Sequence, residues 1–213
     1  MPQPLSLMLD AVRRNVAEPA LQRVSALVEI NDLLAELENS TSKISDLVRA
    51  VKEYSYMDQA PVQDVDLTKG LENTLTIMAH KLRKGVTIKR DYNPTPLLVN
   101  SYGSDLNQVW TNIIDNAIDA MDGHGELRIK TFAEGDSAVV EIGDSGPGIP
   151  PDIQSRIFEP FFTTKGVGDG TGLGLDTTLR IVRKHRGSIN VTSVPGDTRF
   201  QVRLPAVGLA VHD

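Results

Sequence analysis

Two asparagines four residues apart stand in an otherwise apolar stretch, Asn112-Ile-Ile-Asp-Asn116-Ala-Ile-Asp-Ala. Because residues four apart share one face of a helix, we expect both side-chain amides to point in the same direction. An amide oxygen is a hard, neutral ligand that suits Mg²⁺ when phosphates and water complete the coordination. The same pattern also fits a pair of capping or core asparagines.

A carboxylate precedes a Gly-Pro-Gly turn at Asp144-Ser-Gly146-Pro-Gly148. An aspartate at the end of a strand can accept a hydrogen bond from an exocyclic amine, and glycines let the backbone approach a flat ring. An ordinary turn is the alternative interpretation.

Glycine then occupies every second position from 166 to 174, directly after Lys165 and before an apolar helix. Backbone N–H groups at a helix start bind anions, and a lysine supplies a point charge suited to a terminal phosphate. A flexible linker is the alternative. The spacing is G-x-G-x-G, and the P-loop pattern G-x-x-x-x-G-K-[ST] is absent.

Metal-hydrolase chemistry has no support in the sequence. The four histidines lack ligand spacing, and we expect each to be a surface residue: His80, His124, His185 and His212. The chain has no cysteine, which excludes disulfides, thiolate metal sites and cysteine nucleophiles.

The three motifs, together with Ile157-Phe158-Glu-Pro-Phe161-Phe162-Thr-Thr-Lys165, resemble the N, G1, F and G2 boxes of the GHKL ATPase superfamily. They are most similar to the catalytic domain of two-component sensor histidine kinases, from about Asp64 to Pro205. The resemblance implies ATP and Mg²⁺ as cofactors and a Bergerat fold, the histidine kinase-like ATPase sandwich.

The resemblance also implies a role for each matching residue. Asn116 would hold Mg²⁺, Asn112 and Lys165 would act at the phosphates, and Asp144 would bind the adenine amine. Gly146 and Gly148 would shape the adenine pocket, and Thr198 would support Asp144. Phe158, Phe161 and Phe162 would anchor the front of a mobile lid. The phosphate-facing hinge of the lid would be formed by Gly170, Gly172 and Gly174, with Thr171 near the phosphates and Leu173 of the same motif also binding the nucleotide.

The residue at position 112 separates the subclasses of this superfamily. Members that hydrolyse ATP carry a glutamate four residues before the magnesium asparagine, where it activates water, and this chain has Asn112. Because an amide cannot take a proton near neutral pH, this position favours a kinase over an ATPase motor.

The hydrophobic pattern predicts an α+β fold, a two-layer α/β sandwich of helices on strands, over residues 61–213. We expect helices and strands at these ranges: helices Leu67–Leu82, Asp105–Met121 and Leu173–His185, and strands Val86–Tyr92, Gly125–Thr131, Ala138–Asp144, Ser188–Ser193 and Arg199–Leu204.

For residues 1–60 the sequence predicts a helical arm, with a short helix at Leu5–Val16 and a long helix from Leu21 to about Tyr56. Apolar or small residues recur there at alternating spacings of four and three, which favours a homodimeric helix bundle over a simple cap. The arm resembles the dimerisation region of the kinases but lacks its phosphoacceptor histidine. A fragment that begins after that histidine and a degenerate relative both explain this, and the start Met1-Pro-Gln-Pro favours the fragment.

Composition agrees with a cytoplasmic protein that binds no nucleic acid. The net charge is −6, and no apolar run is long enough for a membrane span. The predicted function is transfer of the ATP γ-phosphoryl group to a histidine on a phosphoacceptor helix, for relay to a response-regulator receiver domain. The alternatives are a GHKL-type ATPase and a non-catalytic nucleotide-binding or interaction module.

Overall fold

The computed structural model describes residues 62–82, 85–165 and 172–208, and separate positions between 25 and 41 that are helical and exposed. The predicted helix at Leu5–Val16, most of the long helix, Gly170, Thr171 and His212 lie outside the described residues. The chain divides into two units, Met1–Val48 and Arg49–Asp213. The boundary predicted near residue 60 stays a prediction. All elements named below belong to the second unit.

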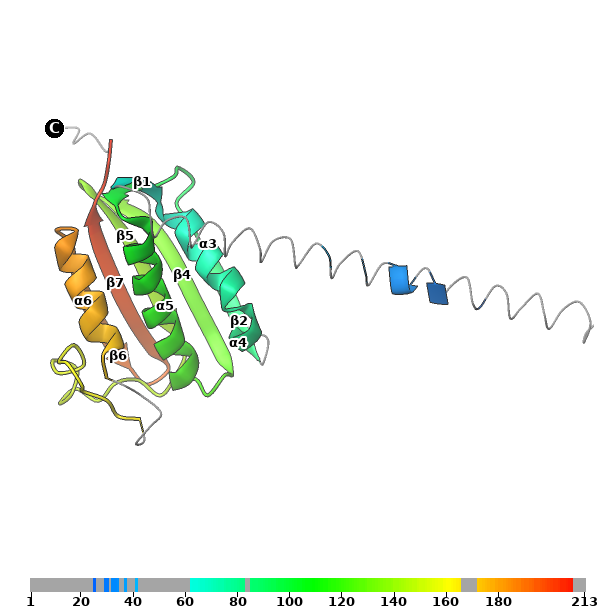
Figure 1. Ribbon diagram of the computed structural model, residues 1–213. Coiled ribbons are helices and arrows are strands. Elements are labelled where there is room, and N and C mark those ends of the chain that lie inside the picture. Colours follow the sequence, from blue (N-terminus) through cyan, green and yellow to red (C-terminus); the bar gives the residue numbers. More distant parts are fainter. Residues whose placement is uncertain are drawn as a thin grey trace, which may run out of the picture. The chain divides into compact units, whose positions relative to one another are not determined.

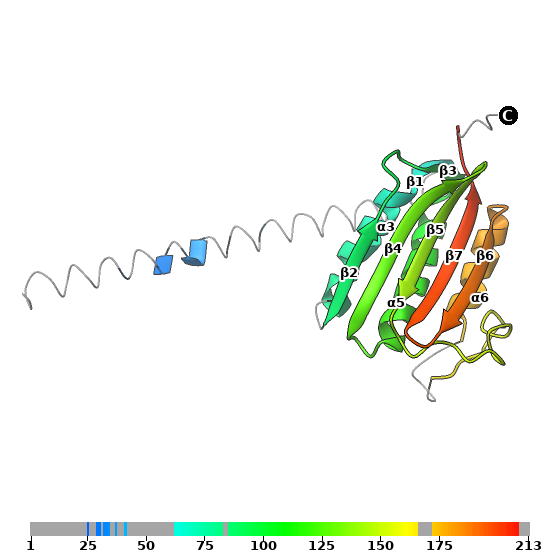
Figure 2. The same cartoon turned by 180° about the vertical axis from the view of Figure 1, so that it is seen from behind.

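The second unit consists of a mixed sheet with helices packed on one face (Figure 1). Its elements, in chain order, are β1 (Gln63–Asp66), α3 (Leu67–Ile77), α4 (Ala79–Leu82), β2 (Val86–Asp91), β3 (Leu98–Ser101), α5 (Gly103–Ala120), β4 (Gly125–Glu134), β5 (Ser137–Asp144), α6 (Gly174–Lys184), β6 (Ser188–Val194) and β7 (Asp197–Pro205). The five-stranded sheet has the order β2-β4-β5-β7-β6, with β2 parallel to β4 and the other pairs antiparallel. Seen from behind, the strands lie in front of α3, α5 and α6 (Figure 2).

Helix α5 lies at the centre of the helical layer, between α3 and α6 (Figure 1). Its buried residues recur every three or four positions, so they form one apolar stripe that packs on the sheet: Leu106, Val109, Trp110, Ile113, Ile114, Ala117 and Ile118. Alternate residues of β4, β5 and β7 supply the other half of the core. Each large apolar side chain buried in this way stabilises the fold by roughly 1.5–3 kcal/mol.

The predicted α+β sandwich is confirmed, and the predicted strands match β2, β4, β5, β6 and β7 closely. The single helix predicted over Leu67–Leu82 is instead α3 and α4, separated at Met78. The small antiparallel sheet of β1 and β3 was not predicted, because each strand has only four residues and too short an alternation to detect. Across the described residues, every helix falls short of the length or apolarity that a membrane crossing requires.

A polar cluster joins α5 to α6 at the N-terminal end of α5. Asp105 Oδ2 lies 2.7 Å from Lys184 Nζ and 3.0 Å from His185 Nε2, at the C-terminal end of α6. Partial burial would raise the pKa of Asp105, but hydrogen bonds from Lys184 and His185 outweigh it and hold that pKa below its ordinary value. The cluster fixes the antiparallel packing of the two helices that carry the site at their other ends.

The expectation that all histidines lie on the surface is wrong for His185, whose side chain is only 8% exposed. Its partner Asp105 is 80 residues away in the sequence, so local spacing gave no sign of the contact. His80 and His124 are exposed, as predicted.

Candidate nucleotide-binding site

A cavity of about 710 Å³ opens between the C-terminal half of α5, the end of β5 and the start of α6. Most of the predicted site residues line it: Asn112, Asn116, Asp144, Gly148, Phe162, Lys165, Gly172, Gly174 and Thr198. They come from five separate stretches of the chain, so only the fold brings them together. The volume of the cavity is in the range of pockets that hold a drug-sized ligand.

The other predicted residues are placed differently. Gly146 is buried and Leu173 is 38% exposed, and neither is among the residues that line the cavity. Phe158 packs its ring edge-to-face against Phe200, with centroids 6.4 Å apart. Phe161 is 74% exposed, and its predicted anchoring role stays a prediction.

The two asparagines of α5 have different surroundings. Asn112 Nδ2 donates to the carbonyl oxygen of Gly174 at 2.9 Å and lies 3.3 Å from Thr178 Oγ1. Asn112 therefore ties α5 to the first turn of α6. Asn116 lies one turn further along on the cavity wall, and among the described residues its amide has no hydrogen-bond partner. Asn116 is thus the amide that is available to a ligand.

Asp144 ends β5 and is only 3% exposed. Burial raises the pKa of its carboxyl, and the Gly146 N–H, which donates to Oδ1 at 2.8 Å, opposes this. An added Cβ at Gly146 would lie 2.8 Å from that same oxygen, so a side chain there would displace the carboxylate. The chain therefore holds a buried, oriented hydrogen-bond acceptor at the cavity wall.

A polar network that sequence reasoning missed supports the strand beside Asp144. Thr198, directly opposite Asp144 in the sheet, has its hydroxyl 2.8 Å from Ser193 Oγ, which also accepts the Ile149 N–H at 2.8 Å. Gln154 Nε2 donates to the carbonyl oxygens of Ile149 and Ser193. The network fixes the segment after Gly148 against β6 and β7.

The glycine-rich segment is joined to the phenylalanine motif at its base. The Phe161 N–H donates to the Gly172 carbonyl oxygen at 2.9 Å, and both residues have positive φ, 66° for each. A Cβ at Gly172 would lie 2.4 Å from the carbonyl carbon of Phe161. Only glycine fits this close backbone approach.

Two acidic residues of α5 that were not predicted as site residues also line the cavity. Asp119 forms an ion pair with Lys165, and Asp115 forms one with Lys81 of α4. The Asp115 hydrogen bond raises the pKa of Lys81 despite partial burial. Asp115 and Asp119 lie one turn apart on α5, the helix that also carries Asn112 and Asn116. This spacing could have indicated from the sequence that both aspartates belong to the site.

The described residues contain no cluster of three or more His, Cys, Asp or Glu that could hold a metal alone. The amide of Asn116, which has no hydrogen-bond partner among the described residues, instead fits a Mg²⁺ ion that takes most of its ligands from phosphate oxygens and water. The chemistry of the cavity thus agrees with a metal that arrives with its nucleotide.

The mixed sheet, the one-sided helical layer and this cavity agree with the histidine kinase-like ATPase fold that the sequence motifs predict. Residues 102–208, half of the chain, match the family described as Histidine kinase-, DNA gyrase B-, and HSP90-like ATPase. The chain belongs to this family, and the predicted resemblance to the catalytic domain of sensor histidine kinases is confirmed.

Curated relatives extend the match beyond this domain. The chain is 32% identical over 191 residues to the sensory histidine kinase/phosphatase NtrB of Rhodobacter capsulatus, covering 84% of this chain and 52% of the relative. It is 33% identical over 202 residues to the signal transduction histidine-protein kinase AtoS of Escherichia coli strain K12, covering 92% and 31%. The chain therefore spans about half the length of NtrB and a third of AtoS.

Solved structures agree with the fold. The catalytic domain of histidine kinase ThkA superposes with a TM-score of 0.63 at 28% identity, covering 68% of this chain and 96% of that one. Full-length ShkA in complex with AMPPNP gives a TM-score of 0.61 at 26% identity, covering 86% and 40%.

Proposed function

We propose that this chain binds Mg-ATP in the cavity beside α5 and transfers its γ-phosphoryl group to a histidine side chain. The observation that carries the proposal is the convergence of the Asn116 amide, the buried Asp144 carboxylate and Lys165 on one cavity. The similarity to ShkA, which was solved with AMPPNP, supports a nucleotide in the same place.

We assign the following roles to predicted residues at the part of the cavity that the structure describes. The buried carboxylate of Asp144 accepts a hydrogen bond from the adenine amine, with Gly146, Gly148 and Thr198 shaping that wall. At the other end, Asn116 holds Mg²⁺ and Lys165 neutralises phosphate charge. Catalysis then consists of positioning and charge neutralisation, as in phosphoryl transfer generally.

Steady ATP hydrolysis is the second candidate function, and the surroundings of α5 disfavour it. Asn112 is an amide and already donates to Gly174, so it cannot act as a base toward water. The two aspartates of α5 that line the cavity, Asp115 and Asp119, are each engaged in an ion pair with a lysine. ATP would therefore persist in the cavity until a protein nucleophile arrives.

The remaining parts of the proposal concern partners. The proposed acceptor is a histidine on a phosphoacceptor helix that is not part of these 213 residues, which contain no histidine before His80. The phosphoryl group would then pass to a response-regulator receiver domain, and the arm would form a homodimer in the cytoplasm. NtrB and AtoS are both named as histidine kinases, which supports the proposed transfer to a histidine.

The test mixes this chain with a separately made phosphoacceptor helix, ATP and Mg²⁺. A kinase yields an acid-labile phosphohistidine on the helix, and the matched Asn116→Ala variant yields much less. Phosphate release at the same rate with and without the helix would favour the ATPase, and nucleotide binding without either product would favour a non-catalytic module.

A further inference from the structure

The cavity has an unfavourable charge for a triphosphate. Among the described residues that line it, the carboxylates are Asp115, Asp119 and Asp144, and the only cation is Lys165. A nucleotide carries several negative charges into this space, so its phosphates need every positive charge that the cavity offers. The partner of Lys165 therefore matters for affinity.

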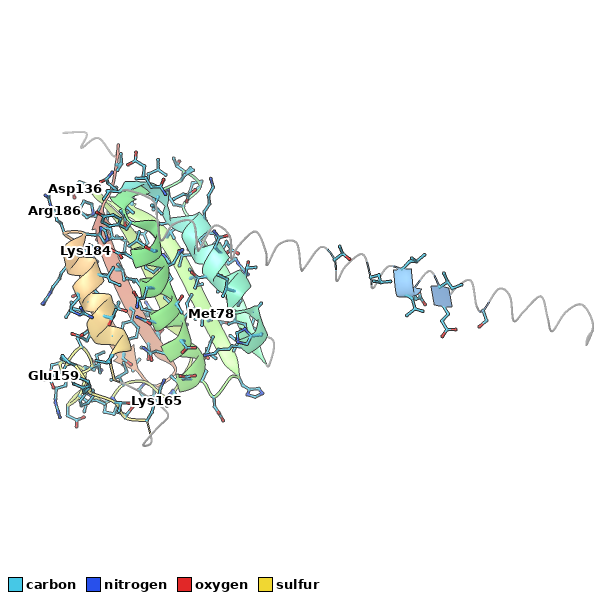
Figure 3. All side chains as sticks on the ribbon, viewed as in Figure 1. Met78, Asp136, Glu159, Lys165, Lys184 and Arg186 are labelled. Atoms are coloured by element: carbon cyan, nitrogen blue, oxygen red, sulfur yellow. The ribbon has the colours of Figure 1, made fainter. Side chains whose placement is uncertain are left out.

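That partner is a carboxylate from the same cavity. Lys165 Nζ forms an ion pair with Asp119 Oδ2, and the side chains are 34% and 40% exposed. The backbone at Lys165 is fixed by its N–H, which donates to Thr163 Oγ1 at 3.1 Å. Figure 3 shows Lys165 beside the C-terminal end of α5, the part of the helix where Asp119 lies.

We infer that Asp119 sets the affinity for phosphate-bearing nucleotides, because it competes with the terminal phosphate for the Lys165 ammonium. This inference rests on the proposed function. A phosphate that takes Lys165 must break the Asp119 pair, and it leaves the Asp119 carboxylate facing the nucleotide without its cation. Asp119 thus weakens binding twice, once by competition and once by repulsion.

The repulsion also makes binding depend more strongly on the metal. Asp119 lies three residues from Asn116 on the same helix, so its carboxylate is close to the proposed Mg²⁺ position. A divalent cation there offsets the charge that Asp119 adds. A neutral side chain at 119 should therefore reduce the ratio between affinities measured with and without Mg²⁺.

Asp115 provides a matched control within the same cavity. It is also a lining carboxylate on α5, but its partner Lys81 belongs to α4 and does not line the cavity. Substitution of Asp115 by asparagine therefore removes the same charge without freeing a cavity lysine. The difference between the two variants isolates the competition for Lys165 from general repulsion.

The experiment measures binding of AMPPNP and of adenosine by calorimetry on the full chain and its variants, after thermal melts confirm folding. Asp119→Asn should tighten AMPPNP binding about twofold to fivefold, which is the range for an exposed ion pair. Adenosine, which has no phosphate, should bind equally to both proteins. Asp115→Asn should have a smaller effect, and added salt should reduce all of these differences.

A double-mutant cycle decides whether the competition exists. In the Lys165→Met background, Asp119→Asn should lose most of its effect on AMPPNP, because there is no ammonium left to release. An equal gain in both backgrounds, or a gain no larger than that of Asp115→Asn, would overturn the inference. Absence of any AMPPNP binding to the unsubstituted chain would instead overturn the proposed function.

Discussion

At the scale of single residues, Asp144 shows how one backbone contact gives a carboxylate a direction. The Gly146 N–H occupies Oδ1, so Oδ2 is the acceptor left for a ligand. An asparagine at this position would keep its oxygen toward Gly146, since a backbone N–H needs an acceptor. Its NH₂ group would then face the adenine amine, donor against donor.

We therefore expect Asp144→Asn to weaken ATP-analogue binding about tenfold, the cost of one lost hydrogen bond and an unsatisfied donor. Calorimetry with AMPPNP and Mg²⁺ measures this. GTP, whose base carries a carbonyl at the corresponding position, should lose less or gain. If the substitution changed neither the affinity for the ATP analogue nor the affinity for the GTP analogue, Asp144 would not bind the base.

The same substitution should have a pH-dependent effect on stability. Burial raises the pKa of Asp144, so its contribution to stability is present in acid and is lost as the pH rises through the folded-state pKa. An asparagine does not ionise, so the Asp144→Asn variant does not lose this stability as the pH rises. The variant should therefore be more stable than the parent at pH 7 but not near pH 3. Urea unfolding at both pH values tests this, and a variant that is less stable at pH 7 would contradict it.

At the scale of elements, the contact between Phe161 and Gly172 closes the base of the glycine-rich segment. We expect Gly172→Ala to reduce nucleotide affinity by at least about tenfold, because its Cβ would overlap the Phe161 backbone and shift a cavity wall. Gly196→Ala is a matched control, since Gly196 also has positive φ, 85°, but has no atom within 4 Å of an added Cβ. That control should cost about 1 kcal/mol of stability and leave binding intact.

Equal losses of affinity in the two alanine variants would mean that the Phe161–Gly172 contact has no special role. Thermal melts of both variants separate a local change at the cavity from general unfolding. Only a loss confined to Gly172→Ala, with most of the fold intact, agrees with the structure.

The elements differ in how far the sequence predicted them. The apolar stripe of α5 and the alternation of β4 and β5 predicted the sandwich, because each pattern is local and repeats several times. The motifs likewise predicted Asn116 and Asp144 on one cavity. The pairs Lys165–Asp119 and His185–Asp105 join residues 46 and 80 positions apart, so no local pattern indicated them. From the sequence alone, a charged residue fits any exposed position, because its ion-pair partner is known only when the fold is known.

At the scale of the whole molecule, the few described positions of the N-terminal unit include a row of exposed apolar side chains. Ile30, Leu33, Leu34 and Leu37 are helical and 52–62% exposed. Burial of each such side chain against another helix would stabilise the association by roughly 1.5–3 kcal/mol. The row therefore supports the proposed homodimer, with the same stripe on both copies.

We expect the double substitution Leu34→Asp with Leu37→Asp to weaken dimerisation more than ~100-fold, because a symmetric interface would hold four unpaired carboxylates. Sedimentation or light scattering measures the change, and Asp32→Ala on the same helix is the control that should leave the dimer intact. The cavity residues all belong to the second unit, so AMPPNP affinity should not change in the double variant. A double variant that stays dimeric would place the interface elsewhere, and one that loses both dimerisation and AMPPNP binding would show that the two units depend on each other.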